Sequence, residues 1–344
     1  MLSRNSLSSA LMTCAASFAS ARGASPGMWH VSLQYYIDSL ANLAASLCNG
    51  SPETDDGILL AIVLLYAHNF MSGSSYQDLP QHVSAAMRIV ISRLLNATVS
   101  GALSAFDHMA LESVLYQVFL LNTGLWSSAM SYEPLRPLNS EFWDRSEELL
   151  DHPANLSFAL LSLNSPVLGV PVSLMRLAMF LGQLCLGRQS GTMEDLKKLQ
   201  TKVAAWEESA LQAMAKIDAP DTLNRDANCL YAMVSSILIQ HLVTFGPSTG
   251  FPKVRCLDNW QTRIALNILC RRSGDPHWSA SHIGTWPVYA MGFLLDDYKE
   301  RDIVRRDMQA RQDLTGFWIV KRFQEDLKSS WASAHHKSIK STLR

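Results

Sequence analysis

Apolar residues recur at intervals of three and four along most of this chain, and this spacing constrains its fold more than any other feature. In residues 193–217 they form a single stripe along one face of the expected helix: Met193, Leu196, Leu199, Val203, Trp206, Ala210 and Met214. Such a stripe usually packs in a protein core, although the seam of a coiled coil has the same pattern. The periodicity therefore predicts a helical protein.

The same spacing, or a wholly apolar run, predicts most of the other elements. Further helices are expected over residues 31–48, 57–71, 79–95, 103–122, 172–187, 226–242, 257–270 and 313–331. Loops are expected over residues 133–153 (with one short helix), 246–252 and 273–281. No strand pair joined by a tight turn and no fixed repeat is found. We therefore expect an all-α fold, a single large multi-helix domain of about ten to twelve helices over residues 1–335, followed by a polar, basic tail at 336–344.

Composition limits the classes of function. Hydrophobic residues make up 48% of the chain and charged residues 17%, which suffices for a large core. The net charge is −1, although residues 271–344 hold 13 lysines and arginines against 9 acidic residues. A domain that grips DNA usually carries a denser basic stripe. We therefore expect no sequence-specific DNA binding by this chain, and no membrane span, because the apolar runs are shorter than the ~20 residues that a bilayer needs.

The cysteines predict no metal site. The six cysteines include no CxxC pair, and four of them lie in apolar, helix-like sequence. A structural zinc ion needs thiolate or imidazole ligands that short spacings bring together. We expect reduced thiols, no bound metal and no cofactor.

The N-terminal segment allows two interpretations. Residues 1–37 contain Arg4 and Arg22 but no acidic residue, as in a secretory signal or a transit peptide. The apolar residues from Leu7 to Phe18 are also spaced by three or four, as in an ordinary helix, and we favour that interpretation.

One motif resembles an enzymatic metal site. Asp296, Asp297 and Glu300 have the DDxxE spacing with which class I terpene synthases hold magnesium against a diphosphate. The motif lies near the C-terminus instead of in the first third of the chain, and the second metal motif does not follow it. Neighbouring arginines also suit ion pairs on an exposed helix. A magnesium-dependent, terpene synthase-like enzyme is therefore the alternative hypothesis.

No other catalytic set is predicted. We expect no Gly-rich phosphate loop and no GxSxG nucleophile elbow. Cys14 or Cys185 would need a histidine partner to act as a nucleophile, and the sequence does not place one. The histidines at 277, 282, 335 and 336 suit solvated or capping roles. The chain is therefore expected not to be an enzyme, with no catalytic and no cofactor-binding residue.

The most specific motif lies in residues 284–331. A Trp-Pro step leads into a helix with a small residue, and then come an acidic-to-basic segment and a Trp- and Phe-bearing helix. The proline is expected to hold Trp286 in an extended conformation and to occupy the first position of the helix. The residues that carry the motif are Trp286, Pro287, Gly292, Arg301 and Trp331. Their order resembles the C-terminal signature of the fungal-specific transcription factor domain, the helical region that follows a binuclear zinc cluster in many fungal regulators.

The likeness extends over residues 5–332 through looser motifs. These are Tyr35-Tyr36 before Ala41-Asn42-Leu43, Asp56–Phe70 followed by His82–Leu94, Met109–Leu121 with Tyr116, Leu168-Gly169 with Leu174–Leu184, and Ala227–Leu242 with Tyr231 and His241. Two departures are clear: Ala85 or Ala86 stands for the usual glycine, and the arginine customary after Tyr231 is missing.

The resemblance implies a regulatory role in the nucleus. The expected partners are other transcription regulators or a small effector, in a homo- or heterodimer. The family's CxxCxxxxxxC cluster is absent from the 344 residues. A missing 5′ exon in the gene model, a regulator that acts through a partner, and a decayed fragment all explain this, and a helical scaffold unrelated to transcription remains a third class of function.

Overall fold

The computed structural model describes residues 2–23, 25, 27–49, 56–72, 79–95, 103–124, 126, 140–150, 167–215 and 222–342. These residues form fourteen α helices and one π-helical turn, and their only β-type pairing is an isolated bridge between Val254 and Leu295. The all-α prediction is confirmed. The helices outnumber the ten to twelve expected; one of them, α12 (Pro276–Ala280), lies in a segment that we predicted to be a loop.

The described residues fall into two compact units. Unit 1 is drawn from Met1–Asn122, Glu133–Leu168 and Thr315–Ile319, and unit 2 from Thr123–Tyr132, Gly169–Leu314 and Val320–Arg344. The boundary between a domain and a tail at residue 335 stays a prediction. The last helix, which begins at Trp318, continues to Thr342.

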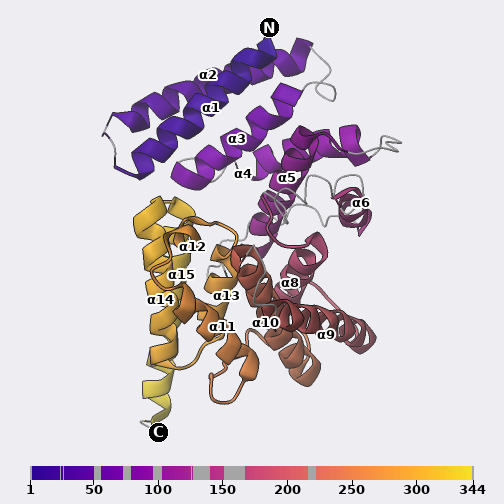
Figure 1. Cartoon of the computed structure of the whole chain (residues 1–344), viewed down its shortest axis with the longest axis vertical. Helices are drawn as coiled ribbons and strands as arrows, with labels where there is room; N and C mark the ends of the chain where they lie inside the picture. Colours follow the sequence, from indigo (N-terminus) through magenta and orange to yellow (C-terminus); the bar gives the residue numbers. More distant parts are fainter. Residues whose placement is uncertain are drawn as a thin grey trace. The chain divides into compact units, whose positions relative to one another are not determined.

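Unit 1 is built on an N-terminal helical hairpin (Figure 1). Its helices are α1 (Leu2–Ala21), α2 (Met28–Asn49), α3 (Asp56–Ser72), α4 (Leu79–Val90), the π-helical turn η3 (Ile91–Leu95), α5 (Ala105–Thr123) and α6 (Ser140–Leu150). Helix α1 packs against both α2 and α3. Helix α3 is apolar almost all round, and such a helix must be buried. Its residues Ile58, Leu59 and Leu65 are at most 2% exposed, as the sequence predicts.

The contact between α1 and α2 is made by small polar residues. The hydroxyls of Ser39 and Ser32 donate to the carbonyl oxygens of Ser6 and Thr13 at 3.1 Å each. The apolar stripe predicted for the first helix instead faces outward, because Leu11 is 52% and Phe18 is 42% exposed. The predicted N-terminal helix is present, but its apolar face is not part of the core.

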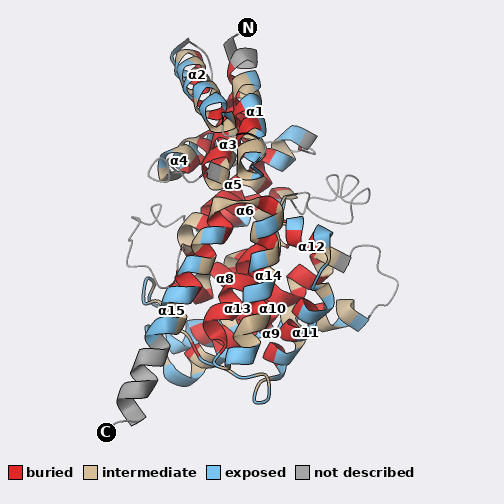
Figure 2. Cartoon of the chain, turned by 90° about the vertical axis from the view of Figure 1, so that its left-hand side faces the viewer, coloured by how far each residue is buried: buried red, intermediate tan, exposed pale blue. Residues whose placement is uncertain are grey.

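Unit 2 is arranged around α10. Its helices are α8 (Val172–Cys185), α9 (Met193–Ala215), α10 (Thr222–Phe245), α11 (Trp260–Arg272), α12, α13 (Thr285–Leu294), α14 (Tyr298–Thr315) and most of α15 (Trp318–Thr342). Helix α10 packs against α8, α9, α11 and α13. Figure 2 shows buried residues concentrated on α8, α10 and α13.

Helix α10 is long and apolar enough to cross a membrane over Leu223–Phe245, yet its most apolar window is 67% buried within the protein. It also carries the fully buried Asp226, which forms ion pairs with Arg271 and Arg272. A buried core helix explains both observations.

The centre of the α9 stripe belongs to the core, although Met193 at its start is exposed. Leu196, Val203 and Ala210 are buried, and α9 packs against α10. Of the two interpretations of this stripe, the structure therefore supports core packing.

The predicted continuous helix over residues 313–331 is wrong. Helix α14 ends at Thr315, Gly316 has a φ of 66°, and α15 begins at Trp318. A side chain at position 316 would collide with the backbone of Ala21, so glycine is required both for its conformation and for this close approach.

Candidate functional site: the C-terminal signature helix

The C-terminal motif centres on α13, a helix in which all ten residues are buried. Its sequence, TWPVYAMGFL, offers no polar face, so the helix can exist only with neighbours on every side. Trp286 and Tyr289 are both fully buried. The five motif residues predicted from the sequence lie on α13 or on the two helices that follow it.

We expected Pro287 to be the first residue of the helix, but it is not. Helix α13 begins at Thr285, which puts Trp286 inside the first turn in a helical conformation and Pro287 at the third helical position. The first N–H groups of a helix have no acceptor within the helix, so a proline is tolerated there. The prediction of an extended Trp286 followed by a proline at the first position is therefore wrong.

Trp286 lies in an aromatic cluster within unit 2. Its ring stacks on that of Tyr231 with a centroid separation of 5.2 Å, and meets the edge of Trp126 at 5.9 Å. Trp126 in turn stacks on Phe251 at 3.9 Å. Aromatic pairs in these geometries contribute about 0.5–1.5 kcal/mol each beyond their burial. Trp286 therefore anchors α13 against α10.

A buried polar junction ties α13 to α15. The hydroxyl of Tyr289 donates to Asp326 Oδ2 at 2.6 Å. The backbone N–H of Trp126 donates to the Tyr289 hydroxyl oxygen at 2.7 Å and to Asp326 Oδ2 at 3.0 Å. Burial and the negative charge of Asp326 raise the pKa of Tyr289 well above its ordinary value. Tyr289 therefore remains a neutral donor, and the carboxylate of Asp326 is satisfied by two hydrogen bonds.

Gly292 allows a close approach between helices. A Cβ at this position would lie 2.7 Å from Leu327 Cδ2 and 3.1 Å from Val304 Cγ1. The Trp331 indole N–H donates to the Gly292 carbonyl at 2.9 Å, which satisfies an acceptor near the C-terminal end of α13. The small residue of the motif is thus required by packing.

Arg301 lies beside the contact between Gly292 and Trp331. Its Nε donates to the Leu295 carbonyl at 3.0 Å, and its guanidinium lies 5.9 Å from the centre of the Trp331 ring. Burial lowers the pKa of Arg301, while Asp296 opposes this shift. The structure therefore brings Gly292, Arg301 and Trp331 together at one end of α13, whereas Trp286 and Pro287 lie at the other end.

The DDxxE carboxylates all have partners within the protein. Asp297 Oδ1 accepts from the backbone N–H groups of Lys299 and Glu300 at the start of α14. Asp296 lies 3.3 Å from the guanidinium of Arg255, and Glu300 accepts from the Cys256 N–H at 2.8 Å. Burial raises the pKa of Glu300. Within the described ranges, no group of three histidine, cysteine, aspartate or glutamate side chains is placed to hold a metal ion.

A second buried network lies beside the motif and was not predicted. Arg311 is 1% exposed, and it donates to Asp307 at 2.7 Å and to the Ser281 carbonyl at 2.6 Å. Its guanidinium lies 4.7 Å from the centre of the Trp278 ring, whose N–H also donates to Asp307. The i, i+4 spacing of Asp307 and Arg311 was a signal, but on a charged helix it suggests an exposed pair.

The expectation that the chain has no GxSxG spacing was wrong, because residues 246–250 have the sequence GPSTG. The segment follows α10 instead of a strand, so the context of a nucleophile elbow is missing. The Ser248 N–H donates to the Leu184 carbonyl and the Gly250 N–H to that of Cys185, at 3.0 Å each. The turn therefore satisfies the last carbonyl groups of α8.

The fold and this site define an all-helical domain whose motif residues act in packing. The family model described as the fungal specific transcription factor domain matches residues 1–342, so it covers both units. The chain belongs to this family, and the match supports a transcription-regulator-like role. No curated protein and no solved structure matches the chain.

Proposed function

We propose that this chain is a regulatory helical region that acts in the nucleus by binding other transcription regulators or a small effector, and that it neither catalyses a reaction nor recognises DNA sequence by itself. The observation that carries the proposal is the family match over residues 1–342. A match of this length includes both units, so the regulatory role belongs to the chain as a whole.

The placement of the arginines supports the absence of direct DNA reading. Arg271 and Arg272 pair with the buried Asp226, and Arg305 and Arg306 pair with Asp302. An arginine held by a carboxylate offers little charge to a phosphate backbone. These four arginines are therefore engaged by carboxylates within the protein.

The surface of α9 that faces away from α10 is our candidate for the contact with a regulator. Because α10 occupies the apolar stripe, a partner would meet the charged side of α9 (Lys197, Lys198, Lys202 and Glu208 are exposed). Polar rims of this kind favour transient, electrostatically guided contacts.

The proposal is tested by tethering the whole chain to a heterologous DNA-binding module in front of a reporter gene. We expect reporter output to change severalfold relative to the module alone, and a tagged chain to accumulate in the nucleus. The double variant Lys197→Glu/Lys202→Glu should reduce the change, and Lys299→Glu, an exposed lysine on α14, should not. An unchanged reporter together with a cytoplasmic chain would overturn the regulatory proposal.

Binding to DNA is tested separately with the purified chain. We expect at most weak, salt-sensitive retardation of any duplex, with no preferred sequence. A sequence-specific complex that persists against excess competitor DNA would contradict the proposal.

No observation favours the terpene synthase hypothesis over this one, because Asp296, Asp297 and Glu300 cap a helix and join two segments. Release of diphosphate from a prenyl diphosphate in the presence of magnesium would restore it.

A further inference from the structure

The single extended pairing in the described parts of the chain leaves an open edge. Val254 pairs with Leu295: its N–H donates to the residue before Leu295 at 2.8 Å, and its carbonyl accepts from the residue after it at 3.1 Å. Along an extended chain, alternate residues direct their N–H and C=O groups to opposite edges. The backbone groups of Lys253 and Arg255 therefore point away from Leu295.

These backbone groups can pair with another chain. The N–H and C=O of Lys253 and the N–H of Arg255 have no partner among the described residues, and both residues are exposed. The Arg255 carbonyl accepts from the N–H groups of Asp258 and Asn259, so the turn that follows ends the extended segment. We call residues 253–255 the open edge. An unpaired edge is a template on which a further strand can form.

Two large apolar side chains stand beside the open edge. Leu257 is 92% and Tyr298 is 80% exposed, the two highest values among the exposed large hydrophobic residues of the described chain. The segments that carry them are joined, because the Cys256 N–H donates to Glu300 at 2.8 Å. Exposed apolar groups that lie next to unpaired backbone groups indicate a contact with another protein.

Three cations gather around one carboxylate at this edge. Asp296 lies 3.3 Å from Arg255 and 3.9 Å from Arg301, and Lys253 is within electrostatic range of both Asp296 and Arg301. Burial of the amine and repulsion by Arg301 lower the pKa of Lys253 to about 8, while Asp296 opposes this shift. The cluster has an excess of positive charge, which a carboxylate from another chain would offset.

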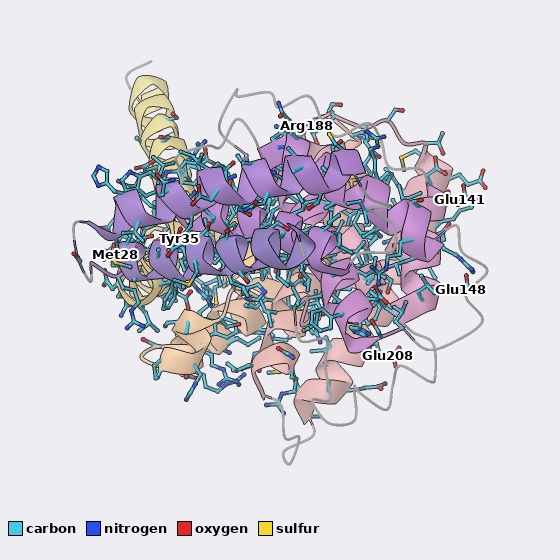
Figure 3. The ribbon with its side chains drawn as sticks, turned by 90° about the horizontal axis from the view of Figure 1, so that it is seen from above. Met28, Tyr35, Glu141, Glu148, Arg188 and Glu208 are labelled. Atoms are coloured by element: carbon cyan, nitrogen blue, oxygen red, sulfur yellow. The ribbon has the colours of Figure 1, made fainter. Side chains whose placement is uncertain are left out.

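Side chains that end in nitrogen or oxygen project from many of the helices (Figure 3), so only an unbalanced group of charges favours one kind of partner. Asp297 and Glu300, which follow Asp296, both accept hydrogen bonds from backbone N–H groups. Asp258 is exposed on the turn beyond the open edge, and Lys299 is exposed with the opposite charge. The positive surplus therefore lies at the open edge itself.

We propose that the open edge binds an extended segment of a partner protein, which adds to it as a strand. The segment carries a carboxylate that pairs with Lys253 and Arg255, and apolar residues that cover Leu257 and Tyr298. In this mode of recognition the main-chain hydrogen bonds give affinity, and alternate side chains give specificity.

This inference goes beyond the proposed function, because it names a surface distinct from the charged side of α9 and holds whether or not the chain acts in the nucleus. An unchanged reporter would leave peptide binding at the open edge intact. Absence of peptide binding would leave the regulatory role intact.

The test begins with a library of short random peptides, selected for binding to the purified full-length chain. We expect the enriched peptides to alternate apolar and acidic residues, and a labelled synthetic copy to bind with a Kd of about 1–100 µM in fluorescence polarisation. Lys253→Glu/Arg255→Glu should weaken this binding at least about tenfold. Lys202→Glu is the matched control, because this exposed lysine lies on α9 and its change should leave the binding as it is.

A second pair of probes tests the strand geometry. The synthetic peptide is made with N-methyl groups on one alternate set of backbone nitrogens, and separately on the other set. Methylation of the set that faces the open edge should weaken binding at least about tenfold, and methylation of the other set should have little effect, because only one edge of the added strand is paired.

Thermal unfolding of each variant shows whether unit 2 remains folded, and the single variants Lys253→Gln and Arg255→Gln keep the test valid if the double variant misfolds. A library without enriched peptides, or with enriched peptides that lack acidic residues, overturns the proposal. So does binding that the Lys253 and Arg255 variants leave unchanged. Binding that both methylated peptides retain overturns the added strand.

Discussion

The α1–α2 hairpin of unit 1 and the core of unit 2 bury polar groups of different kinds. In unit 1 the buried polar groups around α1 and α2 are mostly hydroxyls and a neutral histidine, joined in the cluster of Ser17, Ser32 and His68. In unit 2 they include ions, such as Asp226 with Arg272 and Asp307 with Arg311. A neutral hydrogen bond contributes about 1 kcal/mol net, whereas removal of one partner from a buried ion pair leaves a charge in the core. Equal burial therefore gives the α1–α2 hairpin and the ion pairs of unit 2 different sensitivities to substitution.

The largest effect is expected for Arg311→Met in unit 2. The change leaves Asp307 charged, 6% exposed and without its cation, and should destabilise the unit by about 3–5 kcal/mol. Urea unfolding, with hydrogen exchange of peptides from α13–α15 to locate the effect, measures this. Arg305→Met on the same helix removes an exposed pair with Asp302, and should change little. Equal losses of unfolding free energy in the two variants would show that the buried pair contributes no more to stability than the exposed one.

Gly292→Val should come next, with a loss of about 1–3 kcal/mol from overpacking against Leu327 and Val304. The thermal unfolding midpoint of purified protein measures this loss. Gly182→Ala in α8 is the control, because a Cβ there lies 3.6 Å from its nearest neighbour, an atom of Trp126. Alanine should be neutral or stabilising at that position. A Gly292→Val protein as stable as the wild type would contradict the close approach of α13.

Unit 1 should lose stability in acid through His68. Burial, helped by the proximity of His82, lowers the pKa of His68 from 6.5 to about 4. Because the folded pKa is below the unfolded one, the unfolded chain binds the proton first, and the stabilisation present above pH 6.5 is lost as the pH falls towards 4. Between pH 7 and pH 5 the loss is about 2 kcal/mol, from 1.36 kcal/mol per pKa unit.

His68→Asn removes this titration while its amide retains a hydrogen-bonding group near the position of Nδ1. Urea unfolding at the two pH values, followed in peptides from α1–α3, should show a smaller pH dependence in the variant. An unchanged dependence would place the titrating group elsewhere in unit 1.

The smallest effect is expected for Trp331→Phe. Phenylalanine keeps an aromatic ring near Arg301 but loses the indole N–H that donates to the Gly292 carbonyl, and the cost is about 1 kcal/mol. The urea midpoint of this variant should lie between those of the wild type and Gly292→Val. A loss as large as that of Arg311→Met would show that the indole has a larger role than one hydrogen bond.

The sequence predicted the class of fold because helical periodicity is local. It placed the helix over 193–217 close to the observed Met193–Ala215, and it identified α3 as buried. The sequence-based predictions failed where tertiary contacts determine a helix end or the orientation of a helix face. Gly316 ends α14 inside a stretch of helical periodicity, and the stripe of Leu11 and Phe18 faces outward although its spacing is that of a core face.

The site was predicted only in part for the same reason. The five motif residues were named from a family likeness, but their neighbours come from distant parts of the chain. Trp126 and Asp326 are separated by 200 positions, and no local pattern indicates that they meet. The buried pair of Asp307 and Arg311 was not predicted, because a spacing along one helix cannot reveal that Trp278 covers both side chains.

The junction of Trp126, Tyr289 and Asp326 can form only after Asp326 has been synthesised, late in translation. At about 5–20 residues per second, the 200 positions from Trp126 to Asp326 take about 10–40 s to synthesise. Helix α13 is synthesised near the end of that interval, so only over the last stretch before Asp326 is it present without α15, whose Asp326 and Trp331 it contacts. A stop codon before residue 326 would leave the nearly complete chain without the helix that closes its core.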